Sequence, residues 1–247
     1  MTLALQTTAR LHPSDPGMRR VRLGLFAAAL ATYALLYTPQ PLLPLISSGF
    51  RVSPAAASLA MSAGTFALAV AVIPVSSLSE VFGRRRIMIV SAISAGILGL
   101  AAPLAPSLAM LVLLRVVQGV ALAGLPATAM AYLAEEVAPE SLGRVMGLYI
   151  AGNAIGGLSG RVVAGSLATG GGWRIAAFGV SAMSLACAVA LAFLLPRSRF
   201  FTPAPPRLGV LFSSLRRNLA DTGLLRLYLI GFALMGAFVT VYNYLTF

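Results

Sequence analysis

Two long apolar runs joined by a very short charged turn constrain this chain more than any other feature. Residues 55–78 and 87–105 carry no charge, and the turn at residues 80–86 holds one acid and three arginines. A helix rises about 1.5 Å per residue, so each run can cross a hydrocarbon core of about 30 Å. We therefore expect two antiparallel membrane-spanning helices with the turn at a membrane surface.

Composition extends this expectation to the whole chain. Of its 247 residues, 59% are hydrophobic and 10% are charged, whereas soluble globular domains average about 25% charged residues. The runs are apolar on all sides rather than alternating, which predicts helices and not a barrel. Cys187 and His12 are single residues of their kinds, so we expect no disulfide, no metal site and no cofactor.

The strong positive charge has a simple interpretation. The net charge is +12, and all 18 basic residues are arginine. Such a charge raises the question of nucleic-acid binding, but these arginines lie at the ends of apolar runs and in short loops. Loops rich in Lys and Arg stay in the cytoplasm, so we interpret the arginines as topology anchors and expect no nucleic-acid partner.

The fold class that we expect is all-α, a polytopic membrane protein with a six-helix bundle and one further transmembrane helix. Residues 1–22 form a cytoplasmic tail, 23–195 the bundle, 196–223 a central cytoplasmic loop and 224–247 the seventh span. The six spans of the bundle are expected at residues 23–46, 55–79, 87–105, 107–134, 145–168 and 175–195. Apolar residues at helical spacing in the central loop predict an amphipathic helix on the membrane surface. They are Leu208, Leu211, Phe212, Leu215 and Leu219.

The arginines also predict the orientation. With the N-terminus in the cytoplasm, only Arg51 and Arg174 lie on the outer side. The inner side then holds Arg10, Arg19, Arg20, Arg22, Arg84, Arg85, Arg86, Arg144, Arg197, Arg199, Arg207, Arg216, Arg217 and Arg226. Since the positive-inside rule counts Lys and Arg, this distribution strongly favours a cytoplasmic N-terminus.

Three short motifs stand in successive parts of the expected bundle. The charged turn follows G-x-x-x-(D/E)-R-x-G-R-R, with Ser76 and Val81 replacing the first glycine and one arginine. Its matching residues are Glu80, Gly83, Arg84 and Arg85. The fourth span carries R-x-x-Q-G as Arg115, Gln118 and Gly119.

The third motif lies in the fifth span and follows G-x8-G-x3-G-P-x2-G-G. Arg161 stands at its proline and Ala164 at one of its glycines. Its matching residues are Gly147, Gly156, Gly160 and Gly165. With these motifs, the chain resembles the major facilitator superfamily of secondary transporters, in an antiporter-like branch of bacterial arabinose-efflux type. The resemblance implies the N-terminal half of the family's fold in a bacterial inner membrane.

The resemblance implies a role for the charged turn. Glu80, Arg84 and Arg85 would form a conformational latch across helix ends, and Gly83 would allow the sharp turn. The alternative is a positive-inside anchor without a gating role, which we favour only for Arg86. An anchor alone does not require an acid, and this observation favours the latch.

Arg115 lies roughly 12 Å into its span at about 1.5 Å per residue. A charge at that depth costs at least about 2.5 kcal/mol, so the side chain should face the protein interior or a water-filled cavity. The resemblance implies a structural or proton-coupling role together with Gln118 and Gly119, and we expect Gln40 and Tyr37 as hydrogen-bond partners. The alternative is that Arg115 snorkels to the outer interface.

Arg161 is expected at a similar depth, and none of the six acids lies in the first six spans. We therefore expect it to line the outer cavity and to favour anionic substrate groups. The candidates for the cavity and the substrate site are Tyr33, Tyr37, Gln40, Asn153 and Arg161.

Glycines of the fifth span predict a close helix contact. Gly152, Gly156 and Gly160 recur every four residues, a spacing that lets another helix approach closely. The resemblance implies a contact with the other six-helix bundle, also involving Gly147 and Gly165; ordinary packing is the equal alternative.

The resemblance implies secondary active transport, with efflux of small organic solutes, sugar- or drug-like, by alternating access. Proton coupling is expected, although the missing intramembrane acid leaves three options: an indirect role of Glu80 with Arg115, a site elsewhere, or another coupling ion. No nucleophile–base pair or nucleotide motif is present in the sequence, so we expect no enzyme. Expected partners are membrane lipid, a small-molecule substrate and protons.

Seven spans are an odd number for such a fold, which pairs two six-span bundles around the substrate. The simplest interpretation is a truncated transporter that needs a missing C-terminal bundle. The alternative is a non-transporting membrane fragment or a half-size subunit that assembles with a second copy.

Overall fold

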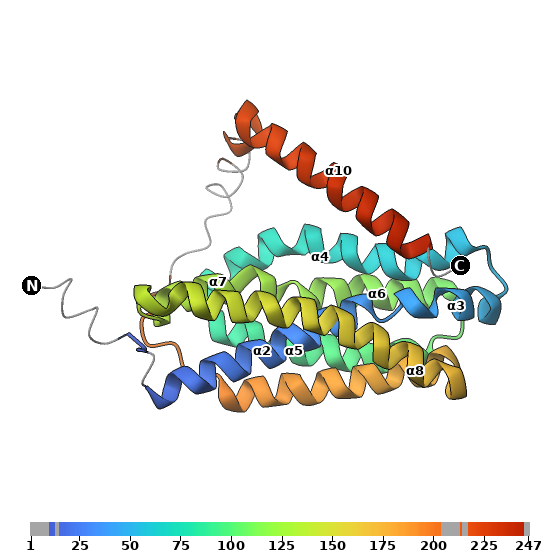
Figure 1. Ribbon diagram of the computed structural model, residues 1–247, viewed down its shortest axis with the longest axis horizontal. Coiled ribbons are helices and arrows are strands. Elements are labelled where there is room, and N and C mark those ends of the chain that lie inside the picture. The colour runs from blue at the N-terminus through green and yellow to red at the C-terminus, as the bar shows by residue number, and fades with distance from the viewer. Residues whose placement is uncertain (1–9, 13–14, 204–212, 214–216, 245–247) are drawn as a thin grey trace, which may run out of the picture.

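The computed structural model describes residues 10–12, 15–203, 213 and 217–244. Within these residues the regular elements are helices, and the one pairing of extended backbone is an isolated bridge between Leu11 and Val137. The all-α fold class is therefore confirmed. The helices of the bundle run side by side along one long axis (Figure 1).

The elements follow one another without any strand in the described part of the chain. They are α2 (Pro16–Tyr37), η1 (Gln40–Leu42), α3 (Leu43–Phe50), α4 (Pro54–Phe82), α5 (Arg84–Ala101), η2 (Ala102–Leu104), α6 (Leu108–Leu122), α7 (Gly124–Glu136), α8 (Pro139–Leu194) and α10 (Thr222–Tyr244).

Five helical stretches are long and apolar enough to cross a membrane. They are Pro16–Phe50, Pro54–Phe82, Arg84–Leu104, Leu108–Glu136 and Pro139–Leu194. The last has 56 residues and bends back at Gly172, where φ is 71°. It thus supplies two spans, the yellow and orange limbs of α8 in Figure 1. These stretches correspond to the six spans expected for the bundle.

The ends of several helices follow from local sequence. The first stretch is interrupted between α2 and α3, where Pro39, Pro41 and Pro44 cluster and a 3-10 turn replaces regular helix. Ser53 caps α4 by accepting a hydrogen bond from the backbone N–H of Ala56 at 3.2 Å. The first helix begins at Pro16, before the predicted membrane entry at residue 23.

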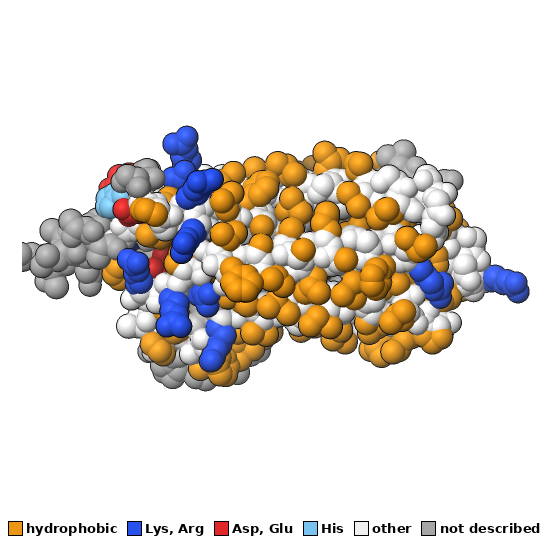
Figure 2. Space-filling view, turned by 90° about the horizontal axis from the view of Figure 1, so that it is seen from below, with side chains coloured by type: hydrophobic (Ala, Val, Ile, Leu, Met, Phe, Trp, Pro, Cys, Tyr) orange, Lys and Arg blue, Asp and Glu red, His pale blue; other side chains and the backbone are white. Residues whose placement is uncertain are grey.

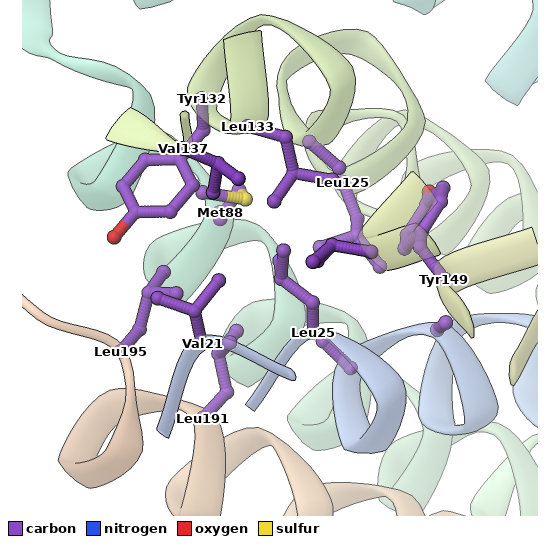
Figure 3. Close-up of a cluster of buried hydrophobic side chains, with 14 of the residues drawn as sticks. Val21, Leu25, Met88, Leu125, Tyr132, Leu133, Val137, Tyr149, Leu191 and Leu195 are labelled. Atoms are coloured by element: carbon purple, nitrogen blue, oxygen red, sulfur yellow. The ribbon is translucent and has the colours of Figure 1, made fainter. Parts of the chain in front are cut away.

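Figure 3 shows part of the largest buried cluster of the bundle. It combines side chains from α2, α5, α7 and both limbs of α8. Val21, Leu25, Met88, Leu125, Tyr132, Leu133, Val137, Tyr149, Leu191 and Leu195 are the residues labelled in Figure 3. This cluster packs α5 against α2, α7 and α8 close to the charged turn.

The surface divides into three zones (Figure 2). On the face shown, arginine side chains gather at the end of the bundle where α2 begins, and fewer lie at the opposite end. A broad hydrophobic zone covers the middle. Large apolar side chains such as Phe66 and Phe193 are exposed on the bundle. This pattern is typical of a membrane protein whose apolar belt contacts lipid.

The helix α10 is the seventh helix expected from the sequence. It runs outside the bundle in Figure 1, and apolar side chains such as Leu227 and Phe232 are exposed along it. Its apolar stretch, Thr222–Ala237, is shorter than the five spans of the bundle. Most of the amphipathic helix expected in the central loop, including Leu208, Leu211, Phe212 and Leu215, lies outside the described residues.

Candidate functional site

The charged turn brings the ends of three helices together. Gly83 has a φ of 94°, a backbone conformation that residues with a side chain rarely adopt. It is the single residue between the end of α4 and the start of α5. Arg84 forms an ion pair with Glu135 at the end of α7, with 3.2 Å between Nε and Oε1. Its Nη1 donates a hydrogen bond to the Ser79 hydroxyl. The turn therefore ties α5 to α7 as well as to α4.

Glu80 has a weaker part in this contact than the motif implied. Its Oε1 lies 4.0 Å from Arg84 Nη2, and its side chain is 41% exposed. Glu135 is nearer to Arg84, and its second carboxylate oxygen is buried without a hydrogen-bond partner among the described residues. Glu135 directly follows the expected fourth span at residues 107–134, and the motif of the charged turn did not identify it as the principal acid of the turn.

Arg85 contacts the end of the sixth span. Its Nε donates to the Leu195 carbonyl at 2.8 Å and its Nη2 to the Ala192 carbonyl at 2.9 Å. A cation at a helix C-terminus satisfies orphan carbonyls and complements the helix dipole. Arg84 and Arg85 thus join the turn to two different helix ends, whereas Arg86 is exposed.

Glu136 is a second acid whose position the sequence did not reveal. It is 2% exposed, and its Oε1 accepts hydrogen bonds from the backbone N–H groups of Arg199 and Phe200 at 2.6 and 3.2 Å. On the other side, its backbone carbonyl accepts from the N–H of Leu11 at 2.9 Å. Glu136 therefore joins the segments before the first span and after the sixth.

Arg115 is buried in the middle of the bundle with 4% of its surface exposed. Its guanidinium donates to three backbone carbonyls, of Ala60 at 2.9 Å, Leu35 at 3.1 Å and Leu36 at 2.8 Å. It also donates to the side chain of Gln118. The expectation that Arg115 faces the protein interior is confirmed, and the snorkelling alternative is excluded.

Gln118 and Gly119 complete this contact. Gln118 donates from Nε2 to the Ala95 carbonyl at 3.0 Å, so it links α6 to α5. A Cβ on Gly119 would lie 2.2 Å from the backbone oxygen of Gly64, because α4 and α6 touch there. A cavity of about 30 Å³ beside Arg115 and Gln118 has room for about one water molecule. The motif of the fourth span therefore joins four helices.

The predicted partners of Arg115 contact Arg161 instead. Arg161 Nε donates to Gln40 Oε1 at 2.6 Å, and Nη1 donates to the Gly157 carbonyl at 3.0 Å. The guanidinium carbon lies 4.2 Å from the centre of the Tyr37 ring, within the range of a cation–π contact. The assignment of Gln40 and Tyr37 to Arg115 was wrong, because the backbone carbonyls of α2 and α4 already satisfy that guanidinium.

Polar and aromatic side chains continue from Arg161 along one stripe of α8. Tyr149, Asn153, Gly157 and Arg161 recur every four residues, and Tyr33 and Tyr37 stand opposite on α2, with ring centroids 6.2 Å apart. The Tyr149 hydroxyl and Asn153 Oδ1 are buried without a hydrogen bond of normal geometry among the described residues, although the two side chains lie close enough to interact with each other. We call this set the α2–α8 polar stripe. Tyr149 belongs to it and was not predicted, although its spacing from Asn153 and Arg161 was visible in the sequence.

The glycines of the fifth span separate into two groups. We consider a Cβ atom added to each glycine. At Gly152 it would lie 3.0 Å from Ala29 Cβ. At Gly156 it would lie 2.5 Å from the Leu30 oxygen, and at Gly160 2.6 Å from Ala34 Cα. These three glycines therefore pack against α2 within the bundle. Nothing lies within 4 Å of such an atom at Gly147 or Gly165, which leaves that face of α8 open.

The arrangement suits binding better than bond making or breaking. The described residues contain no group of three or more His, Cys, Asp or Glu that could hold a metal ion. The α2–α8 polar stripe instead offers a cation, an amide, hydroxyl groups and aromatic rings at the depth of the apolar belt. Polar groups at that depth are costly and mark binding sites or transport pathways.

Comparison with known proteins agrees with this geometry. The sequence profile of the Major Facilitator Superfamily matches residues 25–247. A protein of Bacillus subtilis (strain 168), named uncharacterized MFS-type transporter YybF, is 47% identical over 96% of this chain and 59% of its own length. Inner membrane transport protein YnfM of Escherichia coli (strain K12) is 40% identical over 93% of this chain and 55% of its own length.

A more distant relative is the MFS antiporter QDR3 of Candida albicans. It is 31% identical over 56% of this chain and 20% of its own length. The chain thus spans little more than half the length of the two bacterial relatives that it matches over most of its own length.

Proposed function

The chain belongs to the Major Facilitator Superfamily, and on that premise we propose that it forms one half of a secondary active transporter. In this proposal the complete protein exports small organic solutes, sugar- or drug-like, by alternating access. Membership in a transporter family, with relatives named as transporters, points to a protein that is not an enzyme.

The α2–α8 polar stripe is the observation that carries the proposal. Arg161, Gln40 and Tyr37 converge at one point between the first and fifth spans. Asn153 and Tyr149 lie nearer the arginine-bearing end and close enough to interact with each other, but Asn153 Oδ1 and the Tyr149 hydroxyl are buried without a hydrogen bond of normal geometry among the described residues. Unpaired buried polar atoms cost about 1–3 kcal/mol each, and substrate hydroxyl or amide groups would offset this cost.

An anionic group is the substrate feature that Arg161 favours. All six acids lie outside the first six spans. Arg161 donates to an amide oxygen and a backbone carbonyl and lies over an aromatic ring. A carboxylate or phosphate on the substrate would form charge-assisted hydrogen bonds with its guanidinium.

The proposal assigns Arg115 a structural role and places proton coupling elsewhere. Three backbone carbonyls and Gln118 occupy its donors, so the guanidinium has little freedom to exchange partners. Proton coupling would then involve a carboxylate of the other bundle, or Glu80 and Glu135 at the turn, where Arg84 holds Glu135.

The orientation and the second bundle are parts of the same proposal. The arginine-bearing end lies in the cytoplasm of a bacterial cell, with the protein in the inner membrane, because positive loops remain inside. The exposed apolar side chains of α10 suit a helix of a second bundle that packs outside this one. A second copy of the chain is the alternative occupant.

The test uses the complete reading frame that contains this chain, reconstituted in proteoliposomes. A neutral sugar and the corresponding sugar acid are compared in the wild type and in Arg161→Ala. Transport of the acid should fall about tenfold more than that of the neutral sugar, the equivalent of about one charge-assisted contact.

Arg174→Ala is the control, because Arg174 lies over the Trp173 ring at 4.4 Å and donates to the Ala105 carbonyl outside the stripe. This substitution should reduce transport of both substrates equally. Equal losses for both substrates in Arg161→Ala would contradict the anion preference, and wild-type vesicles that move neither the sugars nor other organic solutes would contradict transport by this protein.

A further inference from the structure

A second polar pocket lies at the arginine-bearing end, away from the α2–α8 polar stripe. It has a volume of about 370 Å³ and is lined by Arg10, Arg199, Phe200, Phe201 and Thr202. Arg10 precedes the first span and the other four residues follow the sixth. We propose that this pocket binds a phosphate group, either of an anionic lipid headgroup or as free phosphate.

The walls of the pocket are held from both sides by the end of α7. Leu11, next to Arg10, exchanges two backbone hydrogen bonds with this segment, at 2.9 Å to the Glu136 carbonyl and 3.1 Å from the Ala138 N–H. Arg199 and Phe200 donate their backbone N–H groups to the Glu136 carboxylate. These contacts bring two arginines that are far apart in the sequence to one pocket.

The neighbouring acids offset only part of the charge of the pocket. The buried Glu136 carboxylate accepts hydrogen bonds from the backbone N–H groups of Arg199 and Phe200 and brings one formal negative charge beside two guanidinium groups. Glu135 is paired with Arg84. Across the described part of the chain, neither Arg10 nor Arg199 forms an ion pair. Two guanidinium groups beside the apolar rings of Phe200 and Phe201 create an electrostatic potential that favours an anion.

The donor set matches a phosphate group better than a carboxylate. The two guanidinium groups and the Thr202 hydroxyl can together donate hydrogen bonds to three phosphate oxygens. Arginine binds phosphate in a bidentate manner. The rings of Phe200 and Phe201 supply an apolar wall suited to the glycerol part of a lipid. Basic pockets near the cytoplasmic ends of spans are suited to anionic headgroups.

The pocket also borders the charged turn. A Cβ on Gly83 would lie 3.5 Å from the ring of Phe201, so a ligand against that ring would sit beside the α4–α5 junction. The pocket is nevertheless formed by other residues than the turn, and its occupancy can be tested separately from transport.

The test measures lipid retention by the full chain in detergent with native mass spectrometry. The probes are phosphatidylglycerol, which has a net negative phosphate headgroup, and phosphatidylcholine, whose phosphate is balanced by an ammonium group. Arg10→Gln/Arg199→Gln should lower bound phosphatidylglycerol by at least about tenfold, since each lost charge-assisted contact is worth about that factor. Phosphatidylcholine binding should remain low throughout.

The control is Arg19→Gln/Arg144→Gln, which removes the same charge from exposed positions at the same end outside the pocket. It should retain phosphatidylglycerol, and thermal unfolding verifies that both double variants are folded. If inorganic phosphate displaces the lipid, the pocket binds free phosphate as well as the lipid headgroup. If inorganic phosphate does not displace the lipid, the lipid headgroup is the ligand. Equal losses in the two double variants, or no loss in the pocket variant, would overturn the proposal.

Discussion

Replacing Gly156 with alanine would place a methyl group inside the backbone of the neighbouring helix. The new Cβ would lie 2.5 Å from the Leu30 oxygen and 2.6 Å from Leu30 Cα. Both are backbone atoms and cannot rotate away, so α8 and α2 would have to separate along their contact. Gly165→Ala is the matched control in the same limb of α8, because nothing lies within 4 Å of its new Cβ.

The magnitude follows from two opposing effects. Glycine to alanine favours a helix by about 1 kcal/mol at both positions, so this effect cancels in the comparison. Overpacking costs about 1–3 kcal/mol, and contact with rigid backbone places Gly156→Ala in the upper part of that range. With about 2–4 °C of Tm per kcal/mol for a chain of this size, Gly156→Ala should unfold about 4–12 °C below Gly165→Ala.

The assay can use the single cysteine, Cys187, which is half-buried in the sixth span. A thiol-reactive fluorescent dye then reports unfolding of the detergent-solubilised chain, and no cysteine has to be introduced. If Gly156→Ala melts at the same temperature as Gly165→Ala or above it, the glycine stripe does not hold α8 against α2.

Three further substitutions test the other contacts. Arg115→Lys should destabilise the bundle by at least about 2 kcal/mol in the same dye assay, since an ammonium cannot reproduce a planar fork to three carbonyls; unchanged melting would contradict this. Gly83→Ala should lower stability by about 1–2 kcal/mol because its φ is 94°, and a melting temperature equal to the wild type would show that the turn relaxes. In double-mutant cycles with Arg84→Gln, Glu135→Gln should show coupling of about 0.5–1 kcal/mol and Glu80→Gln less, whereas the reverse order would restore Glu80 as the main acid.

The helical architecture was open to prediction from sequence because membrane spans follow a one-dimensional rule. A span needs an uncharged apolar run of sufficient length, and turns such as the one at Gly83 are marked by charge and glycine. The interruption of the first span near Pro39 and Pro41 was predictable for the same reason, since proline removes a helix donor. These signals are local and do not depend on how helices pack.

Contacts between helices were less open to prediction. Depth along a span can be counted from sequence, and it predicted Arg115 and Arg161 at one level, but Gln40 was assigned to Arg115 alone. Which of the two faces Gln40 depends on the rotation of each helix about its axis, and only packing fixes that rotation. The roles of Glu135 and Glu136 were missed similarly, because their partners come from segments more than 50 residues away.

Resemblance to the family located the motifs but did not settle what they touch. Gly152, Gly156 and Gly160 pack against α2 of the same bundle, which supports the ordinary-packing alternative for these three. Gly147 and Gly165 lie on the open side of the same span, so they remain the candidates for a contact with a second bundle.

The most direct test of the proposed function asks whether the α2–α8 polar stripe is exposed to water and substrate in the membrane. In a Cys187→Ser background of the complete reading frame, Asn153→Cys should react with a water-soluble maleimide, and bound substrate should slow the reaction. Ile97→Cys on α5, an exposed position outside the stripe, should remain unlabelled because it faces lipid. Absence of labelling at residue 153 under the same conditions would contradict the assignment of the stripe as a transport pathway.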